Sequence, residues 1–178
     1  MNLFGISVKK GSGNSVHQER VEDFIQFLNE IEPVPSHVAN ALRRFIWGDK
    51  TTNGTGDISD RTKNVSKDYY REIEIIQNYF LNNTKEILYR VLVSGAYNDR
   101  VDYIYYGDAK DGVWCPAKDA VDYLSDKFNS RATICIGNLS FQAWNRATYG
   151  GRSEMKRGQI QLKWGSIYND ILAIRNGG

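Results

Sequence analysis

The sequence has few of the features that mark disulfide-rich, metal-stabilised or membrane proteins. Its two cysteines, Cys115 and Cys135, form no CxxC pair, so we expect two free thiols in a reducing cytoplasm. No apolar run is long enough to span a bilayer. The first lysines follow the short apolar run at the N-terminus instead of preceding it. The sequence therefore predicts neither a membrane protein nor a signal peptide.

An excess of one charge is also missing. The formal net charge is only +2, so overall electrostatics gives no reason to expect nucleic-acid binding. We find no internal repeat and no low-complexity segment. The 178 residues, of which 41% are hydrophobic and 25% charged, suffice for one domain with a real core. Aromatic residues make up 12% of the chain and include eleven tyrosines, which suits contact surfaces with polar-tipped rings.

The most informative stretch runs from Leu3 to Glu22. Its apolar start, up to Val8, predicts a short strand, and the following Gly-Ser-Gly predicts a turn into an amphipathic helix. Lys9 then stands at a strand end, where alternation predicts that it shares a face with Ser7 and that Lys10 points to the opposite face. Glu19 and Glu22 fall in the first turns of the predicted helix. A lysine can neutralise a phosphate oxygen, and carboxylates can hold a divalent metal. The alternative is a solvated face, since acidic residues are favoured at any helix N-terminus.

The string SVKKGSGNSVHQE, residues 7–19, resembles the core of type II restriction endonucleases of the PD-(D/E)xK class. In that class a strand carries an acidic or small residue, any residue, and then the catalytic lysine. Ser7 and Lys9 match this pattern, although Ser7 is not acidic. Similar members take the missing carboxylate from the next helix, which implies Glu22 or its rival Glu19 as the catalytic acid and Mg²⁺ ligand.

The remainder of the first half predicts helices. Apolar residues at helical spacing start at Val21 and end before Glu32-Pro33-Val34-Pro35, and a second helix follows from Ser36. Gly48–Asn64 has no periodicity and predicts a loop, either functional or simply disordered. Two further helices are expected between Ser66 and Gly95, with an interruption at Asn82-Asn83-Thr84.

The second half predicts mainly strands. We expect them at 101–106, 113–115, 131–136, 139–144 and 157–164, with one helix opening at Pro116 and a closing helix from Ile167 to Ile174. The strand at 157–164 alternates polar and apolar residues, so Gln159, Gln161 and Lys163 should share one face.

From Asn145 onward the sequence contains six basic residues and only two acidic ones, together with several amides. Cations bind phosphates and guanine edges, and amides bind adenine edges, so this composition is compatible with a DNA-contact face. The alternative is an amphipathic outer strand with a solvated basic face. The strings FQAWNR and GQIQLKW also resemble segments of the same nucleases, which favours DNA contact. The predicted contacts are Gln142, Asn145, Arg146, Lys156, Arg157, Gln161 and Lys163.

Together these features predict a single α/β domain over residues 1–178, a restriction-endonuclease-like mixed sheet flanked by helices. The resemblance implies Mg²⁺-dependent, sequence-specific cleavage of double-stranded DNA by a homodimer. The alternatives are a non-catalytic DNA-binding or partner-binding module on the same fold and, less favoured, a small ligand-binding domain.

One expected element is missing from the sequence. Such nucleases carry an essential Asp on a strand before the lysine strand, yet none of the eight residues before Lys9 is acidic. We therefore expect either that the N-terminal strands are lacking or that a carboxylate comes from elsewhere, with Asp102 and Asp108 as the first suspects.

Overall fold

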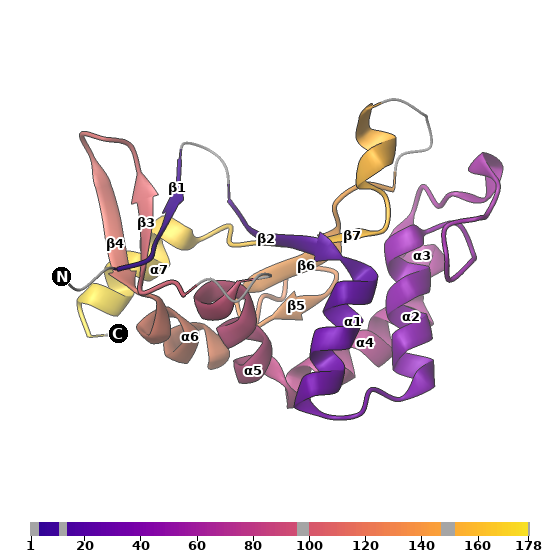
Figure 1. Cartoon of the computed structure of the whole chain (residues 1–178), viewed down its shortest axis with the longest axis horizontal. Coiled ribbons are helices and arrows are strands. Elements are labelled where there is room, and N and C mark those ends of the chain that lie inside the picture. Colours follow the sequence, from indigo (N-terminus) through magenta and orange to yellow (C-terminus); the bar gives the residue numbers. More distant parts are fainter. Residues whose placement is uncertain (1–3, 11–13, 96–99, 147–151, 178) are drawn as a thin grey trace. The chain divides into compact units, whose positions relative to one another are not determined.

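The computed structural model describes residues 4–10, 14–95, 100–146 and 152–177. It is a mixed α/β structure whose strands form two sheets, not the one mixed sheet that the sequence predicted (Figure 1). The chain folds into two compact units. The first comprises Met1–His17, Asn83–Ser140 and Leu162–Gly178, and the second comprises Gln18–Asn82 and Phe141–Gln161. Within the described ranges, no helix has the length and apolar character needed to cross a membrane.

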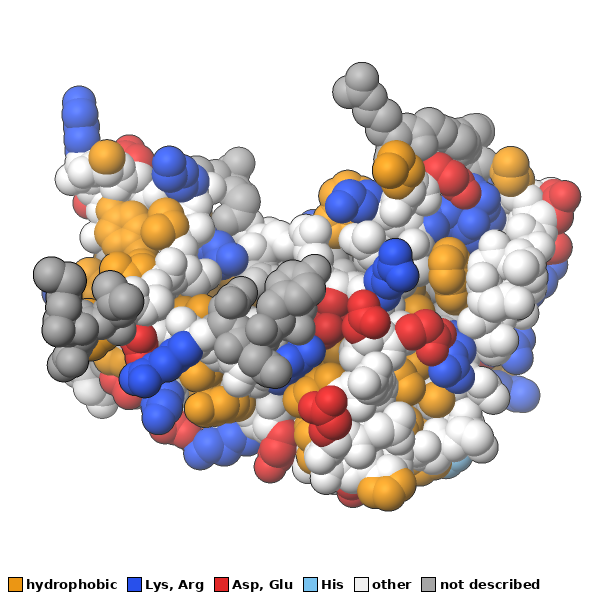
Figure 2. Space-filling model, in the orientation of Figure 1, with side chains coloured by type: hydrophobic (Ala, Val, Ile, Leu, Met, Phe, Trp, Pro, Cys, Tyr) orange, Lys and Arg blue, Asp and Glu red, His pale blue; other side chains and the backbone are white. Residues whose placement is uncertain are grey.

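A three-stranded sheet belongs to the first unit. Its order is β1 (Ile6–Lys9), β3 (Tyr103–Gly107) and β4 (Gly112–Pro116), with β1 parallel and β4 antiparallel to β3. Ile104 and Cys115 are buried on one face, whereas Ile6 and Val8 are more than half exposed on the other. Figure 2 shows apolar side chains gathered over this sheet. Among the described strands only β3 pairs with β1, so β1 is an edge strand of this sheet.

Asp102 joins the start of β1 to β3. Its carboxylate accepts hydrogen bonds from the backbone N–H of Gly5 at 2.9 Å and from Nε of Arg100 at 2.7 Å. The hydrogen bond from Gly5 is the main cause that lowers the pKa of this carboxyl group. Asp108 instead organises the β3–β4 turn, where its Oδ1 accepts the backbone N–H groups of Lys110 and Asp111. Both acids therefore have structural partners.

Helices of the first unit pack beside this sheet. They are α5 (Thr84–Tyr89), the π-helical turn η2 (Arg90–Ser94), α6 (Ala117–Ser125) and α7 (Ile167–Arg175). Gly95 ends η2 with φ of +64°, a conformation that favours glycine. The buried Trp164 donates from Nε1 to Oδ2 of Asp170 at 2.6 Å, and Asn138 donates to the same oxygen at 2.9 Å. These bonds anchor the start of α7.

The second sheet has the order β2 (Ser15–Arg20), β7 (Gln159–Lys163), β6 (Leu139–Ala143) and β5 (Cys135–Ile136). The prediction that a helix follows directly after the glycine turn is wrong, because residues 15–20 form β2. Along β2, His17 and Glu19 are buried while Gln18 and Arg20 are exposed, which is the two-residue period of a strand. The predicted strand at 131–136 is reduced to its last two residues.

Aromatic packing builds the core of the second unit. Its helices are α1 (Val21–Ile31), α2 (Ser36–Trp47), α3 (Val65–Asp68) and α4 (Tyr70–Asn82), and the predicted apolar faces of α1 and α2 are confirmed. Phe141 lies 4.9 Å from Phe80, 5.7 Å from Phe24 and 6.1 Å from Phe45, measured between ring centroids. The side chain of Asn64 caps α3 by accepting the N–H of Lys67, so the helical region begins at Val65, one residue before the predicted Ser66.

The long loop after α2 is held by a buried acid. Asp49 is fully buried, and its carboxylate accepts hydrogen bonds from Thr51, from the N–H of Gly56 and, at 2.9 Å, from Nη2 of Arg157. A short 3₁₀ turn, η1 (Ile58–Asp60), follows, and Arg61 then pairs with Glu154 of the 3₁₀ turn η3 (Arg152–Lys156) at 2.6 Å. The loop is therefore tied to the segment before β7 rather than left structureless.

Candidate active site

Ser7 and Lys9 line a small pocket in the first unit. Both side chains come from the same face of β1, because residues two apart in a strand point the same way. The pocket has a volume of about 170 Å³, and Val16 and His17 line it from the adjoining β2 segment. Its remaining walls are Val91, Leu92, Gly95, Val101 and Ile104. The side chain of Lys9 thus lies on the predicted face of the strand, and this face borders a pocket rather than open solvent.

The ammonium group of Lys9 is partly desolvated. Burial lowers its pKa from the ordinary value, since a charged group loses hydration in an apolar surrounding. Its Nζ donates to the backbone oxygen of Val16 at 3.4 Å, which is a long hydrogen bond. No carboxylate is among the described residues that line this pocket. Lys10, by contrast, is exposed.

The two predicted acids occupy different elements. Glu19 lies near the end of β2 and Glu22 lies in the first turn of α1, so the prediction that one helix carries both is wrong. Arg43 binds both carboxylate oxygens of Glu22, at 2.8 and 2.7 Å. This hydrogen bonding is the main cause that lowers the pKa of Glu22. Glu22 and Glu19 belong to the second unit and Lys9 to the first, so neither unit alone contains the predicted set.

Within the described ranges, the acids predicted from the sequence are not gathered into a magnesium site. Mg²⁺ requires near-octahedral oxygen coordination and is usually held by carboxylates. Across the described ranges, no group of three or more His, Cys, Asp or Glu side chains is arranged to hold a metal. The carboxylate of Glu22 is already hydrogen-bonded to Arg43. The carboxylates of Asp102 and Asp108 accept hydrogen bonds from backbone N–H groups of the first unit. Of the two acids that the lysine motif implied, Glu19 is the buried one.

His17 is a site residue that the sequence analysis did not select. It contributes to the pocket beside Lys9, and it shares the buried face of β2 with Glu19. The signal was present in the string Val16-His17-Gln18-Glu19, which alternates as a strand does. It was missed because the segment was assigned to a helix, where these side chains would point in different directions.

Arg146 and Arg157, two of the predicted DNA contacts, bind backbone oxygens near the end of α2. Arg146 donates from Nε to the backbone oxygen of Phe45 at 2.7 Å, and its guanidinium lies 4.3 Å from the Phe45 ring centroid. Burial lowers the pKa of Arg146 to about 10. Arg157 donates to the oxygen of Trp47 at 3.3 Å as well as to Asp49. Cations are favoured at a helix C-terminus, which explains both placements.

The predicted amide face is also partly internal. Gln142 donates from Nε2 to Oε1 of Gln161 at 3.0 Å, and Gln161 is buried. Ile160 and Leu162 are buried too, because β7 is an inner strand between β2 and β6. The side chains of β7 therefore do not alternate between exposed and buried, although their residue types alternate between polar and apolar. Asn145, Lys156 and Lys163 keep partial exposure.

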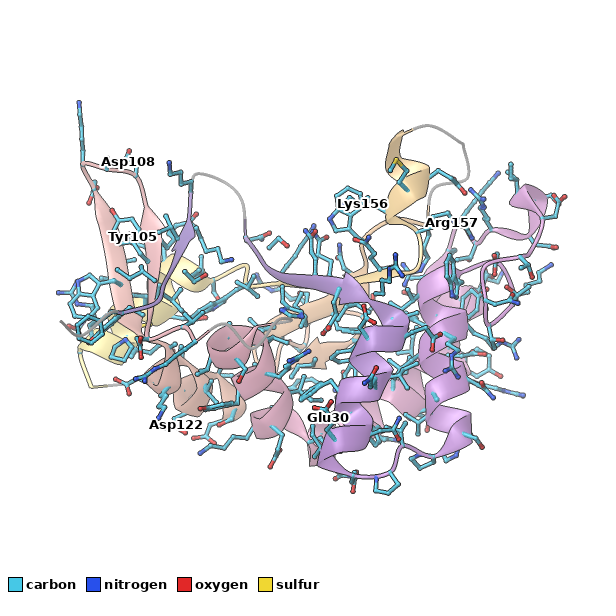
Figure 3. The ribbon with its side chains drawn as sticks, in the orientation of Figure 1. Glu30, Tyr105, Asp108, Asp122, Lys156 and Arg157 are labelled. Atoms are coloured by element: carbon cyan, nitrogen blue, oxygen red, sulfur yellow. The ribbon has the colours of Figure 1, made fainter. Side chains whose placement is uncertain are left out.

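Lys156 is one of the predicted contacts that are partly exposed. Its ammonium lies 5.4 Å from the ring centroid of Trp144, a geometry in which the ring attracts the cation (Figure 3). Arg157, the next residue, instead has a side chain only 6% exposed. Lys156 is therefore accessible to a partner, whereas the side chain of Arg157 is internal.

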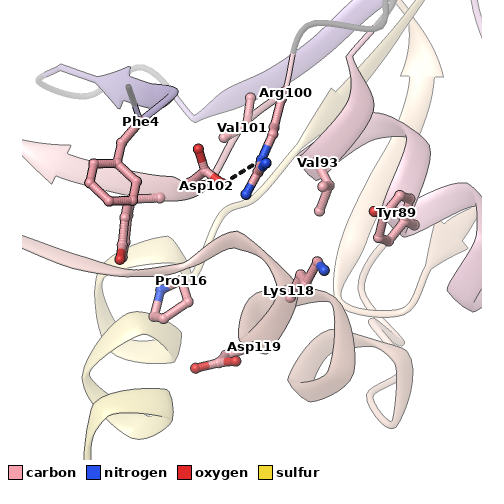
Figure 4. Close-up of a pocket in the computed structure, with 10 residues that line it drawn as sticks. Phe4, Tyr89, Val93, Arg100, Val101, Asp102, Pro116, Lys118 and Asp119 are labelled. Atoms are coloured by element: carbon pink, nitrogen blue, oxygen red, sulfur yellow. Dashed lines mark hydrogen bonds and ion pairs between the residues drawn. The ribbon is translucent and has the colours of Figure 1, made fainter. Parts of the chain in front are cut away.

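A larger cavity lies beside the three-stranded sheet. It has a volume of about 560 Å³, and its aromatic, apolar and charged lining comes from α5, η2, β3, β4 and α6 and from the segments before β1 and β3 (Figure 4). Arg100 and Lys118 contribute two cations, and Asp102 and Asp119 contribute two carboxylates. Because these charges balance, the lining favours no particular ligand class. The ligand-binding interpretation of the chain thus gains no specific support from it.

The sequence matches no protein-family model, and a search of curated proteins gives no match. The similarity to nucleases therefore depends on the lysine motif and its surroundings.

Proposed function

We propose that this chain is a nuclease component of the PD-(D/E)xK class that acts on double-stranded DNA in the presence of Mg²⁺. The observation that carries the proposal is the pocket in which Ser7 and Lys9 meet. A partly buried ammonium can neutralise a phosphate oxygen or orient a water molecule, and the Ser7 hydroxyl can donate a hydrogen bond beside it. The resemblance of residues 7–19 to the lysine strand of such enzymes supports the same assignment.

Glu19 is the proposed catalytic acid. It lies on β2 two residues after His17, whereas Glu22 is held by Arg43. A single carboxylate is a poor ligand set for Mg²⁺, so we infer that the described residues form an incomplete site and assign no step to a metal. As in the class that it resembles, we propose a homodimer on a palindromic site.

The chain alone should therefore cleave DNA weakly or not at all. The test is an Mg²⁺-dependent assay on a supercoiled plasmid of mixed sequence, read as nicked, linear and fragmented DNA. Cleavage should appear when a segment bearing an additional Asp is supplied, in frame or in trans. Discrete fragments produced by the chain alone would contradict the incomplete site and mean that another acid of this chain completes it.

The second candidate is a DNA-binding module without catalysis, and Lys156 provides its test. As a surface cation beside Trp144, Lys156 should contact a phosphate rather than a base. We expect Lys156→Ala to weaken binding of cognate and random duplexes alike and to reduce the slope of log affinity against log salt by about one. Lys67→Ala, which removes an exposed lysine on α3, is the matched control. An unchanged slope in Lys156→Ala would remove this residue from the interface.

A further inference from the structure

The charge on Lys9 has no described counterion. Its one described hydrogen bond goes to a neutral carbonyl at 3.4 Å, and the pocket around it contains no carboxylate among the described residues. Apolar side chains from η2 and β3 form much of the wall, so water screens the charge poorly. Lys9 is half-buried, so an opposite charge placed beside it would interact more strongly than in open solvent. The pocket therefore suits an anion that enters from solution.

Residues with hydrogen-bond donors line this pocket from two strands. Ser7 and Lys9 come from β1, and His17 comes from β2. A serine hydroxyl and an ammonium both donate hydrogen bonds, and an imidazole donates one when neutral and two when protonated. The volume of about 170 Å³ can hold a group of a few heavy atoms but not a nucleotide. A tetrahedral oxyanion matches both the size and the donors.

We propose that His17 is a second phosphate-binding residue of this pocket, which holds one phosphate oxyanion between His17 and Lys9 with the Ser7 hydroxyl as a third donor. That the oxyanion is a DNA phosphate rests on the proposed function, whereas the anion site itself does not. His17 is a binding residue in this arrangement, and no bond is made or broken by it.

The experiment uses the two histidines of the chain, His17 and His37. In the full-length protein, each imidazole gives a separate proton NMR signal, which the variants His17→Gln and His37→Gln assign. Inorganic phosphate is titrated at a pH of about 6.5, where an ordinary imidazole is about half protonated. We expect a saturable shift of the His17 signal and little change at His37, which is exposed on α2.

Removal of the cation should weaken this binding. In Lys9→Ala, the midpoint of the phosphate titration should rise by about tenfold or more, the loss expected for one charge-assisted hydrogen bond. Lys9→Arg should retain most of the affinity, and Lys10→Ala should retain all of it. An unchanged midpoint of urea denaturation in each variant shows that the fold persists. Equal shifts of both histidines, or a His17 shift that Lys9→Ala leaves intact, would overturn the proposal.

A second arm replaces phosphate with a short DNA duplex without Mg²⁺. A His17 shift in both arms, or with the duplex alone, supports a pocket for a DNA phosphate. A shift with inorganic phosphate alone supports the anion site and counts against the nuclease proposal. No shift in either arm refutes the anion site, while the plasmid assay still decides the nuclease proposal separately.

Discussion

Replacement of Lys9 by alanine is expected to lower the rate of DNA cleavage by at least about 100-fold relative to the unmodified protein in the same assay. The ammonium of Lys9 lies in a pocket with Ser7 and His17, where poor hydration strengthens its interaction with a phosphate. The rate is measured under single-turnover conditions with protein in excess over plasmid, with the chain alone or with a segment that completes the site. Binding of the duplex should weaken much less than the cleavage rate, by about tenfold, the loss expected for one charge-assisted phosphate contact.

Lys10→Ala is the matched control for this prediction. Lys10 is exposed, and successive side chains of an extended chain point to opposite sides, so its removal should leave cleavage within a few-fold of the original rate. An inactive Lys10→Ala beside an active Lys9→Ala would show that the pocket is not the active site.

Loss of the ion pair between Arg157 and Asp49 should destabilise the protein by about 3–5 kcal/mol, the usual cost of an unpaired buried charge. Asp49 is fully buried and the Arg157 side chain is 6% exposed, with 2.9 Å between Nη2 and Oδ2. Arg157→Met removes the cation with its shape largely kept and leaves Asp49 without its charge partner. The free energy of unfolding is measured by urea denaturation of the full chain.

Two controls make this measurement specific. Lys50→Ala breaks the exposed ion pair with Asp60 and should leave the urea midpoint unchanged within error. The double variant Asp49→Ala with Arg157→Met should be less destabilised than the sum of the single variants, because it leaves no charge unpaired. Additive losses, or a loss in Arg157→Met below about 1 kcal/mol, would show that solvent reaches this pair.

The sequence by itself determined those elements in which apolar residues recur at the spacing of a helix or a strand. Helical spacing located α1 and α2 together with their buried faces, and the proline pair located the end of α1. Alternation along the first strand separated Lys9 from Lys10, and the position of Lys9 in the pocket agrees with that separation. These features depend on neighbours within one or two turns of chain, so a local pattern contains the information.

Tertiary structure alone decided how the charged residues are used. Arg157 and Asp49 are 108 residues apart in sequence, and Arg146 reaches a helix end 101 residues away. From the sequence alone, both arginines would be expected at the surface. The local sequence does not reveal the distant partner with which each arginine is buried. Glu22 is likewise occupied by Arg43 on another helix. The strand β2 belongs to the same group, because pairing with β7 overrides the helical continuation of α1, and the strand conformation places His17 in the pocket of Lys9.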